Sequence, residues 1–315
     1  IPAFGYLRSI VLLVEATGGT GSAAVYAADG PFSVLSSIVV TDVNGQPLVG
    51  PISGYDLYLI HKYGGYAFAS DPKNSPVYAA PTSGNFAFAL RIPHEIIQRN
   101  ALGALANGNM ASGYRLTIRT GLASAVWSTN PTTLPSVRVR AFAEEWTQPM
   151  TADARGVPNA TQPPALGTTQ FWTSQIYNLA AGASTPRILR VGNYLRNVIM
   201  VARDGSGARS DTVMSDPIEL DLDGRQLHIV ARPLWKAITA ERYGYAPTQA
   251  DAGVYVWDMT HDFDGHPGGE ITDGWLPTTQ ATRLELRGGN FTAGTLQFLV
   301  NDVAAYSGEI GGVNA

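Results

Sequence analysis

The densest group of metal-ligand residues in the sequence is the segment His261–His266, with Asp258 before it and Glu270 and Asp273 after it. Alternating carboxylates beside a glycine are the oxygen ligands that Ca²⁺ prefers. The spacing does not complete an EF-hand loop, however, and histidines are unusual ligands for calcium. We therefore expect a polar loop between strands here, and no functional metal ion.

His94-Glu95 has the form of the first two residues of the His-Glu-x-x-His helix that binds zinc in metalloproteases. The second histidine of that helix must share a face with the first. Gln98 occupies its position here, so this zinc site cannot form. Because a carboxylate in the first turn stabilises a helix, we predict that His94-Glu95 only begins a helix.

Glu144 and Glu145 could supply the acid of a glycosidase, which needs two carboxyl groups flanking one glycosidic bond. Neighbouring residues of a strand point to opposite faces of the sheet, so this pair cannot flank one bond. We predict that both carboxylates are solvated at the end of a strand and that neither is catalytic.

Other signatures of catalysis or cofactor binding do not occur in the sequence. No serine lies in a Gly-x-Ser-x-Gly turn, no glycine-rich loop has a nucleotide-binding spacing, and there is no cysteine. Asn159-Ala160-Thr161 and Asn290-Phe291-Thr292 match the glycosylation acceptor, a tripeptide that arises by chance in a chain of this length. Four tyrosines at helical spacing could form a binding platform, but beside leucines they are expected to pack: Tyr55, Tyr58, Tyr63 and Tyr66. We predict no catalytic residue and no cofactor.

The composition is that of an all-β protein with a weakly charged surface. Charged residues make up 15% of the chain, and the 34 glycines and 20 prolines follow no period, as many short strands with many turns require. The net charge is -4 and no two Lys or Arg are adjacent, so the clustered cations of a nucleic-acid groove are missing. The most apolar run, Ile10–Val14, is too short to span a bilayer. Such a surface suits broad contact with other protein.

Periodicity predicts strands and two helices in the first 147 residues. Asn44-Gly45 marks a tight hairpin turn, Ser53 and Asp56 form a capping-box pair before a helix that ends at Gly64, and Pro93 opens a second helical stretch that includes Leu105. The predicted strands are 6–14, 34–43, 85–92, 114–119 and 136–146. From about Thr147 to Pro186 the periodicity fades among prolines, threonines and alanines, which predicts a linker across a surface.

After this linker the pattern of the first half begins again, with four matches in the same order. The matching blocks are Tyr6–Leu12 with Tyr194–Met200, Asn44-Gly45 with Asp223-Gly224, the helix before Tyr63-Gly64 with the helix before Tyr243-Gly244, and Arg115–Gly121 with Arg283–Gly289. Four matches in register indicate a duplication. We therefore predict an all-β fold of two tandem eight-stranded jelly-roll β-sandwiches with short helices in the connections, at residues 1–147 and 187–315, joined by a Pro/Thr/Ala-rich linker at 148–186.

Two tandem jelly rolls, each with a helix after its early hairpin, resemble the double jelly-roll major capsid proteins of tailless icosahedral DNA viruses, the lineage of membrane-containing bacteriophages and adenovirus. The repeated blocks carry this resemblance, above all Tyr6-Leu7-Arg8 with Tyr194-Leu195-Arg196. It implies a structural protein of the virion that assembles as a homotrimer with the outline of a hexagon. It also implies neighbouring capsomers, penton and minor capsid proteins and an internal membrane as partners, and no direct sequence-specific binding of nucleic acid.

Two other functions remain open at this point. A secreted glycan-acting enzyme or lectin of two β-sandwiches would place acidic residues at the junction of its halves. A virion spike or a bacterial surface adhesin is the other alternative, although such chains seldom duplicate one jelly roll in tandem. The native mass and the particle morphology distinguish these alternatives from a capsid protein.

Overall fold

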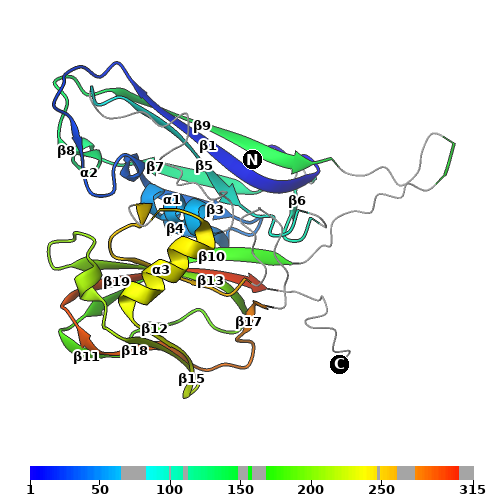
Figure 1. Cartoon of the computed structure of the whole chain (residues 1–315). Helices are drawn as coiled ribbons and strands as arrows, with labels where there is room; N and C mark the ends of the chain where they lie inside the picture. The colour runs from blue at the N-terminus through cyan, green and yellow to red at the C-terminus, as the bar shows by residue number, and fades with distance from the viewer. Residues whose placement is uncertain are drawn as a thin grey trace.

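The computed structural model describes residues 1–64, 83–98, 101–108, 113–147, 155–157, 168–246, 249–260 and 274–304. In this part of the chain most strands form three stacked layers, which Figure 1 shows from top to bottom. We call them the upper, central and lower sheets. None of the described helices is long and apolar enough to cross a membrane.

The upper sheet belongs to the first half of the chain. Its middle strand is β1, which runs antiparallel to a neighbour on either side and whose first residues also pair with a short strand. The strands are β1 (Tyr6–Thr17), β5 (Phe86–Pro93), β9 (Ser136–Trp146) and β6 (Leu105–Ala106).

The central sheet combines strands of both halves in the order β16-β13-β19-β10-β4-β3-β7, with β17 paired to the start of β13. The halves meet at a parallel pairing of Trp172 with Val49. The strands are β16 (Val254–Asp258), β13 (Tyr194–Asp204), β19 (Gly294–Ala304), β10 (Thr169–Leu179), β4 (Pro47–Ile52), β3 (Leu35–Thr41), β7 (Arg115–Thr120) and β17 (Leu276–Pro277).

The lower sheet belongs to the second half and is built around β18 (Leu284–Phe291). Its other strands are β14 (Ile218–Leu222), β15 (Arg225–Val230), β11 (Gly182–Ser184) and β12 (Arg187–Ile188).

Outside these sheets, a separate ribbon pairs β2 (Val25–Tyr26) with β8 (Trp127–Thr129). The described helices are α1 (Gly54–Tyr63), α2 (Ala123–Val126) and α3 (Arg232–Tyr243), with single turns at η1 (Phe32–Val34) and η3 (Asp211–Val213).

Two hydrophobic cores separate the three layers. The first contains Leu12 and Phe88 of the upper sheet together with Ile38 of the central sheet and most of α1. The second contains Met200 of the central sheet and Leu286 of the lower sheet. Each half therefore buries an apolar layer between two sheets, which is the β-sandwich arrangement that the sequence predicted.

The duplication is visible in the order of the elements. The series β1, β3-β4, α1, β5, β7 in the first half returns as β13, β14-β15, α3, β16, β18 in the second. All four repeated sequence blocks fall on equivalent elements, and the two turn glycines, Gly45 and Gly224, have φ of 83° and 86°. The predicted fold of two jelly rolls is confirmed.

A β-bulge repeats in the same place in both halves. The register of β1 against β9 shifts at Arg8, and the register of β13 against β19 shifts at Arg196. In both halves the carbonyl oxygen of the bulged arginine accepts a backbone N–H from the segment after the neighbouring strand. The Arg8 oxygen accepts the N–H of Glu95, after β5, at 2.8 Å. The Arg196 oxygen accepts the N–H of Met259, after β16, at 3.1 Å. Tyr-Leu-Arg therefore marks a repeated geometry as well as a repeated sequence.

The helix predicted before Gly64 forms as expected. The Ser53 hydroxyl accepts the N–H of Asp56 at 3.1 Å, and the Asp56 carboxylate accepts the N–H of Ser53 at 2.8 Å, which closes the predicted capping box.

The helix predicted after Pro93 does not form. Residues 94–98 and 101–104 form a loop that folds onto the bulge of β1, with Ala101 and Gly103 at positive φ. Ile96 and Leu102, which belonged to the predicted helical pattern, instead lie in a small core with Trp275 and Val303 of the second half.

The prediction of a linker over 148–186 was wrong for its C-terminal part, where β10 and β11 lie. Phe171 and Trp172 are adjacent, so the strand lacks the alternation by which a half-exposed strand is recognised. Trp172 is nevertheless buried in the first core, and Phe171 packs against the same core as a partly buried residue. The boundaries of the two predicted units stay predictions.

Candidate functional site

His94 and Glu95 take up structural positions beside the bulge of β1. The Glu95 carboxylate binds the Arg8 guanidinium at 2.8 Å and accepts the indole N–H of Trp146 at 2.7 Å. The His94 ring is buried at 1% exposure, and neither ring nitrogen has a hydrogen-bond partner among the described residues. This burial lowers the pKa of His94 to about 4.

The burial of His94 predicts a loss of stability in mild acid. Its pKa in the folded protein, about 4, lies below the 6.5 of an ordinary histidine, so between these values the unfolded chain binds the extra proton and unfolding is favoured. The stability that His94 contributes is complete above pH 6.5 and falls by about 2 kcal/mol between pH 7 and pH 5. We expect His94→Leu to reduce the pH dependence of the free energy of unfolding, measured by urea unfolding, by this amount.

The exposed His228 on β15 provides the control, because His228→Leu measures separately any general effect of replacing a histidine with leucine. Equal slopes for the wild type and His94→Leu would show that the His94 ring is not desolvated.

Glu144 and Glu145 point to different partners, as predicted for neighbouring strand residues. Glu144 pairs with Arg91 at 3.0 Å and accepts the Ser9 hydroxyl, whereas Glu145 accepts the side-chain amide of Asn107 at 3.1 Å. Both carboxylates are therefore held by protein groups rather than only solvated, and they do not face a common site.

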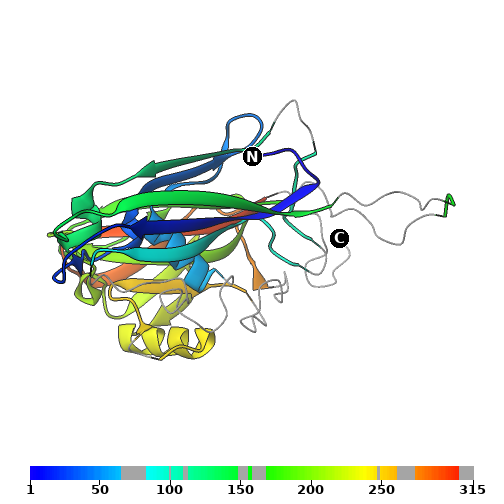
Figure 2. The same ribbon diagram turned by 90° about the horizontal axis from the view of Figure 1, so that it is seen from above.

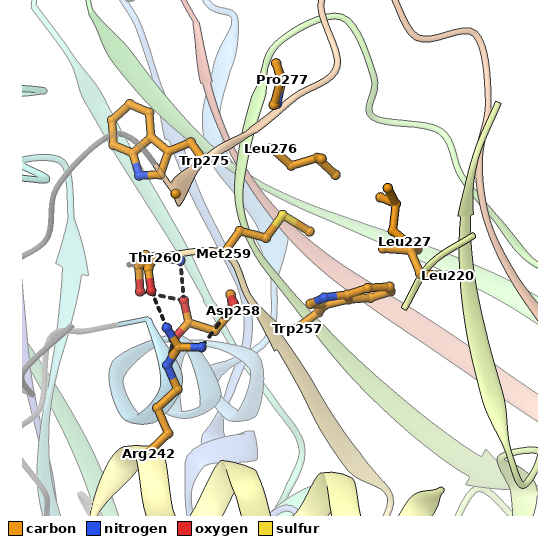
Figure 3. Close-up of a pocket in the computed structure, with 11 residues that line it drawn as sticks. Leu220, Leu227, Arg242, Trp257, Asp258, Met259, Thr260, Trp275, Leu276 and Pro277 are labelled. Atoms are coloured by element: carbon orange, nitrogen blue, oxygen red, sulfur yellow. Dashed lines mark hydrogen bonds and ion pairs between the residues drawn. The ribbon is translucent and has the colours of Figure 1, made fainter. Parts of the chain in front are cut away.

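A pocket of about 510 Å³ lies in the second half beside Asp258, the first residue of the predicted polar loop. Figure 3 shows its apolar wall, with Trp257, Leu227 and Met259, and its polar end, where Arg242 and Asp258 meet. The Asp258 carboxylate binds Arg242 at 3.1 Å, Tyr243 at 2.9 Å and Thr260 at 2.6 Å. The carboxylate is thus bound by donors from three residues of the protein itself.

The remaining residues that the sequence marked are distributed as follows. His261–His266, Glu270, Asp273, Tyr66 and the Asn159 tripeptide lie outside the described residues. Among the described residues no three His, Asp or Glu side chains are grouped as metal ligands. The side chain of Asn290 accepts hydrogen bonds from Ser215 and from the Asp216 N–H, which fixes a loop against β18.

The junction of the halves contains a buried ion pair that sequence reasoning missed. Lys62 of α1 binds Asp251 of the second half at 2.8 Å, and both side chains are 2% exposed. The ammonium also donates to the carbonyl oxygen of Gln249 at 2.6 Å and lies 4.8 Å from the ring centre of Tyr245. Lysine is rarely buried without such compensation.

The predicted tyrosine cluster surrounds this ion pair. The hydroxyls of Tyr55, Tyr58 and Tyr63 donate to the Asp251 carboxylate at 3.0–3.4 Å. Burial, and then the negative charge of Asp251, raises the pKa of Tyr55 and Tyr63 well above the usual value, so both stay protonated donors. The tyrosines therefore pack and bind an internal charge, as the sequence favoured over a ligand platform.

A second ionic contact ties the halves beside this cluster. Asp29 of the first half binds Arg203 at 2.7 Å and Arg209 at 2.9 Å in the second. The Arg209 guanidinium also lies 4.5 Å from the ring centre of Tyr55. Asp29 and Asp251 are thus bound in ion pairs at the junction, which does not suit the catalytic role that a glycan-acting enzyme would give them.

The surface open to other molecules is the outer face of the upper sheet, which Figure 2 views from above. The inward residues of β1 are buried, whereas Val11 and Leu13, on the opposite face, are partly exposed. Phe142 of β9 lies opposite Val11 and is 50% exposed, and Ala89 of β5 lies opposite Leu13. We call these four residues the upper face. Arg91 and Arg140 lie opposite Val11 and Leu13 on their other sides, so apolar and charged side chains alternate on this face.

No protein-family model and no curated protein matches the sequence, but solved structures match most of its length. A crystal structure of the STIV MCP has a TM-score of 0.66 and 17% identity, covering 99% of this chain and 93% of that chain. A structure of Sulfolobus Turreted Icosahedral Virus gives 0.67 and 16%, with 96% and 84% covered. The major capsid protein P2 of bacteriophage PM2 gives 0.58 and 12%, with 98% and 92% covered. At these identities the likeness is one of fold, and the fold of this chain is the double jelly roll of viral major capsid proteins.

Proposed function

We propose that this chain is a major capsid protein that assembles as trimers into the shell of an icosahedral virion. The observation that carries the proposal is the duplicated sandwich, whose halves are joined through Trp172, α1 and the buried Lys62–Asp251 pair. Two similar halves in each chain and a threefold axis give six similar sides, which is the geometry that a hexagonal lattice needs. The fold shared with capsid proteins supports the same function.

In this role the protein acts by geometry and has no catalytic residue. Its partners are further copies of itself in the trimer and in neighbouring capsomers, with penton proteins, minor capsid proteins and an internal membrane as the partners that the resemblance adds. The weakly charged surface, with 15% charged residues in the chain, suits contacts with several protein neighbours. No observation favours the enzyme or lectin alternative.

The native mass of the purified chain tests this function. We expect light scattering behind size-exclusion chromatography to give three times the 33.5 kDa of one chain, and electron microscopy at high protein concentration to show hexagonal arrays or closed shells. A stable monomer that releases sugar or ammonia from a glycan would contradict the proposal.

A further inference from the structure

An extended segment closes one side of the second sandwich. β10 pairs antiparallel with β19 along the whole of both strands, and β11 and β12 then pair with the edge of β18. The segment therefore covers one edge of each sheet, and Leu179 of β10 and Ile188 of β12 are buried in the second core. Without this segment, two sheet edges and one side of the second core would be open to solvent.

The first sandwich has the same two edges without such a segment. Aligned on the repeated bulge, β9 corresponds to β19, and the repeated Arg-Leu block aligns β7 with β18. Within the described residues β9 pairs only with β1, and β7 pairs only with β3. A long strand with a free edge presents unpaired N–H and C=O groups, which readily accept a further strand.

Burial shows the consequence on β7. Leu116 and Ile118 are only partly buried at the first core, although their counterparts in β18, Leu284 and Leu286, are 1% and 0% exposed in the second core. The residues are similar in type and register, so the difference comes from the edge beside them. β12 pairs with Leu284, and the carbonyl oxygen of Pro186 accepts the N–H of Leu286 at 2.9 Å. In the described part of the chain, no strand lies at the matching edge of β7.

The same difference appears on β9. Ala141 lies opposite the buried Leu12 and therefore faces the first core, yet it is exposed. Its counterpart Phe298 lies opposite Met200 in the same way and is 0% exposed. Inward residues of β9 and β7 both contact the first core. This core therefore has an open side between these two strands.

The residues just before β1 and those just before β13 follow the same path. The carbonyl oxygen of Gly5 accepts the N–H of Asn107 at 2.9 Å, and that of Asn193 accepts the N–H of Thr278 at 3.0 Å. The short strands that precede these two donors, β6 and β17, also pair with the same positions of β1 and β13. The chain therefore enters both sandwiches from the same direction.

In the second half this path starts from β12. Ile188 lies on β18, and Leu189 begins the segment that leads to β13. Its counterpart in the first half is Ile1, whose ammonium donates to the carbonyl oxygen of Tyr114, directly before β7, at 2.9 Å. By the same path, a segment that leads into Ile1 comes from the edge of β7.

We propose that the open side of the first sandwich holds an extended segment of the same kind as residues 169–188, continuous with Ile1, with one strand antiparallel to β9 and a shorter one on β7. Its apolar side chains alternate with polar ones and enter the first core, as Leu179 and Ile188 enter the second. The proposal concerns the single chain and does not depend on the capsid function.

The difference between β9 and β19 specifies the chemistry of this segment further. In the second half Gln175 of β10 lies opposite the large Phe298. In the first half the matching position of β9 is the small Ala141. Because protein cores are filled to a nearly constant density, the residue opposite Ala141 is expected to be larger and more apolar than Gln175.

Fusion of a second copy of residues 168–188 directly before Ile1 tests this site. Because Ile1 corresponds to Leu189, the added copy joins the chain in register. We expect the urea midpoint of the fused chain to rise by about 1 M, and hydrogen exchange of the β9 amides that point away from β1 to slow by roughly tenfold or more. The same segment with prolines at alternate positions of its long strand cannot complete the ladder, and it should do neither.

Two neighbouring residues of β9 provide matched variants of the fused chain. We expect Ala141→Glu to abolish the rise in the midpoint, because this side chain faces the first core and the added strand would bury its carboxylate without a partner. Phe142→Glu, on the opposite face of the same strand, should keep the rise. Without the added segment, Ala141→Glu should leave the midpoint close to that of the wild type, since Ala141 is exposed there, which shows that the variant folds.

Three outcomes would overturn the proposal. A fused segment that changes neither the midpoint nor the exchange of the β9 amides would show that the open side does not take a strand. A rise that survives Ala141→Glu would show that the segment binds elsewhere. Protection of the β9 amides by a free peptide of residues 168–188, without any effect of the fused copy, would contradict the entry at Ile1. None of these readouts depends on oligomeric state, so their failure leaves the capsid function standing.

Discussion

Lys62→Met is expected to lower the free energy of unfolding by about 3 kcal/mol or more, because it leaves the buried Asp251 carboxylate without its nearest cation. The tyrosine hydroxyls around Asp251 remain as donors, and the Arg209 guanidinium is farther away, at 3.7 Å. Loss of the pair should also loosen the junction of the halves, since Lys62 belongs to α1 and Asp251 to the segment before β16. Urea unfolding followed by tyrosine and tryptophan fluorescence measures this change.

A double-mutant cycle identifies the pair as the cause. Lys62→Met with Asp251→Asn should cost clearly less than the sum of the two single changes, because the double variant leaves no unpaired charge at this position. Arg140→Met at the partly exposed pair with Glu15 is the matched control, and we expect it to change stability by less than about 1 kcal/mol. Additive single effects at Lys62 and Asp251 would contradict the coupling.

Gly54→Ala is expected to destabilise the protein by about 3 kcal/mol, although alanine normally favours a helix over glycine. A β-carbon at Gly54 would lie 2.0 Å from the carbonyl oxygen of Phe32 and 2.9 Å from the β-carbon of Leu35. Since one of these atoms belongs to the backbone of η1, relief requires α1 to move away from the first core. A shift of α1 also disturbs Lys62, so we expect the urea midpoint to fall and the proposed trimer to be weakened.

Gly205→Ala is the matched control for this substitution. No heavy atom lies within 4 Å of a β-carbon at Gly205, and its φ is not positive, so the change should stay within about 0.5 kcal/mol. If Gly54→Ala were instead more stable than the wild type, the close approach of α1 to η1 would be wrong.

In the proposed capsomer these two positions matter because α1 lies at the junction of the halves. A capsomer with six similar sides requires a constant angle between its two sandwiches, and a buried ion pair and a glycine contact both define position more narrowly than apolar packing alone. Variants that keep the fold but loosen α1 should therefore lose ordered arrays before they lose trimers.

The sequence alone determined the fold class, the duplication and the main features of α1. Those features are local: the capping pair of Ser53 and Asp56, the turn glycines Gly45 and Gly224, and the repeated Tyr-Leu-Arg block all depend on residues near each other in the chain. Local backbone preferences act the same way wherever the segment lies, so a pattern can reveal them.

Only the tertiary structure decided the rest. β10 is a strand because β19 and β4 supply partners from distant parts of the chain, and the segment after Pro93 is a loop because the bulge at Arg8 accepts its N–H groups. Lys62 and Asp251 lie 189 positions apart, and neither carries a local sign of burial. Burial depends on which surfaces the fold brings together, and contacts between distant parts of the chain decide this.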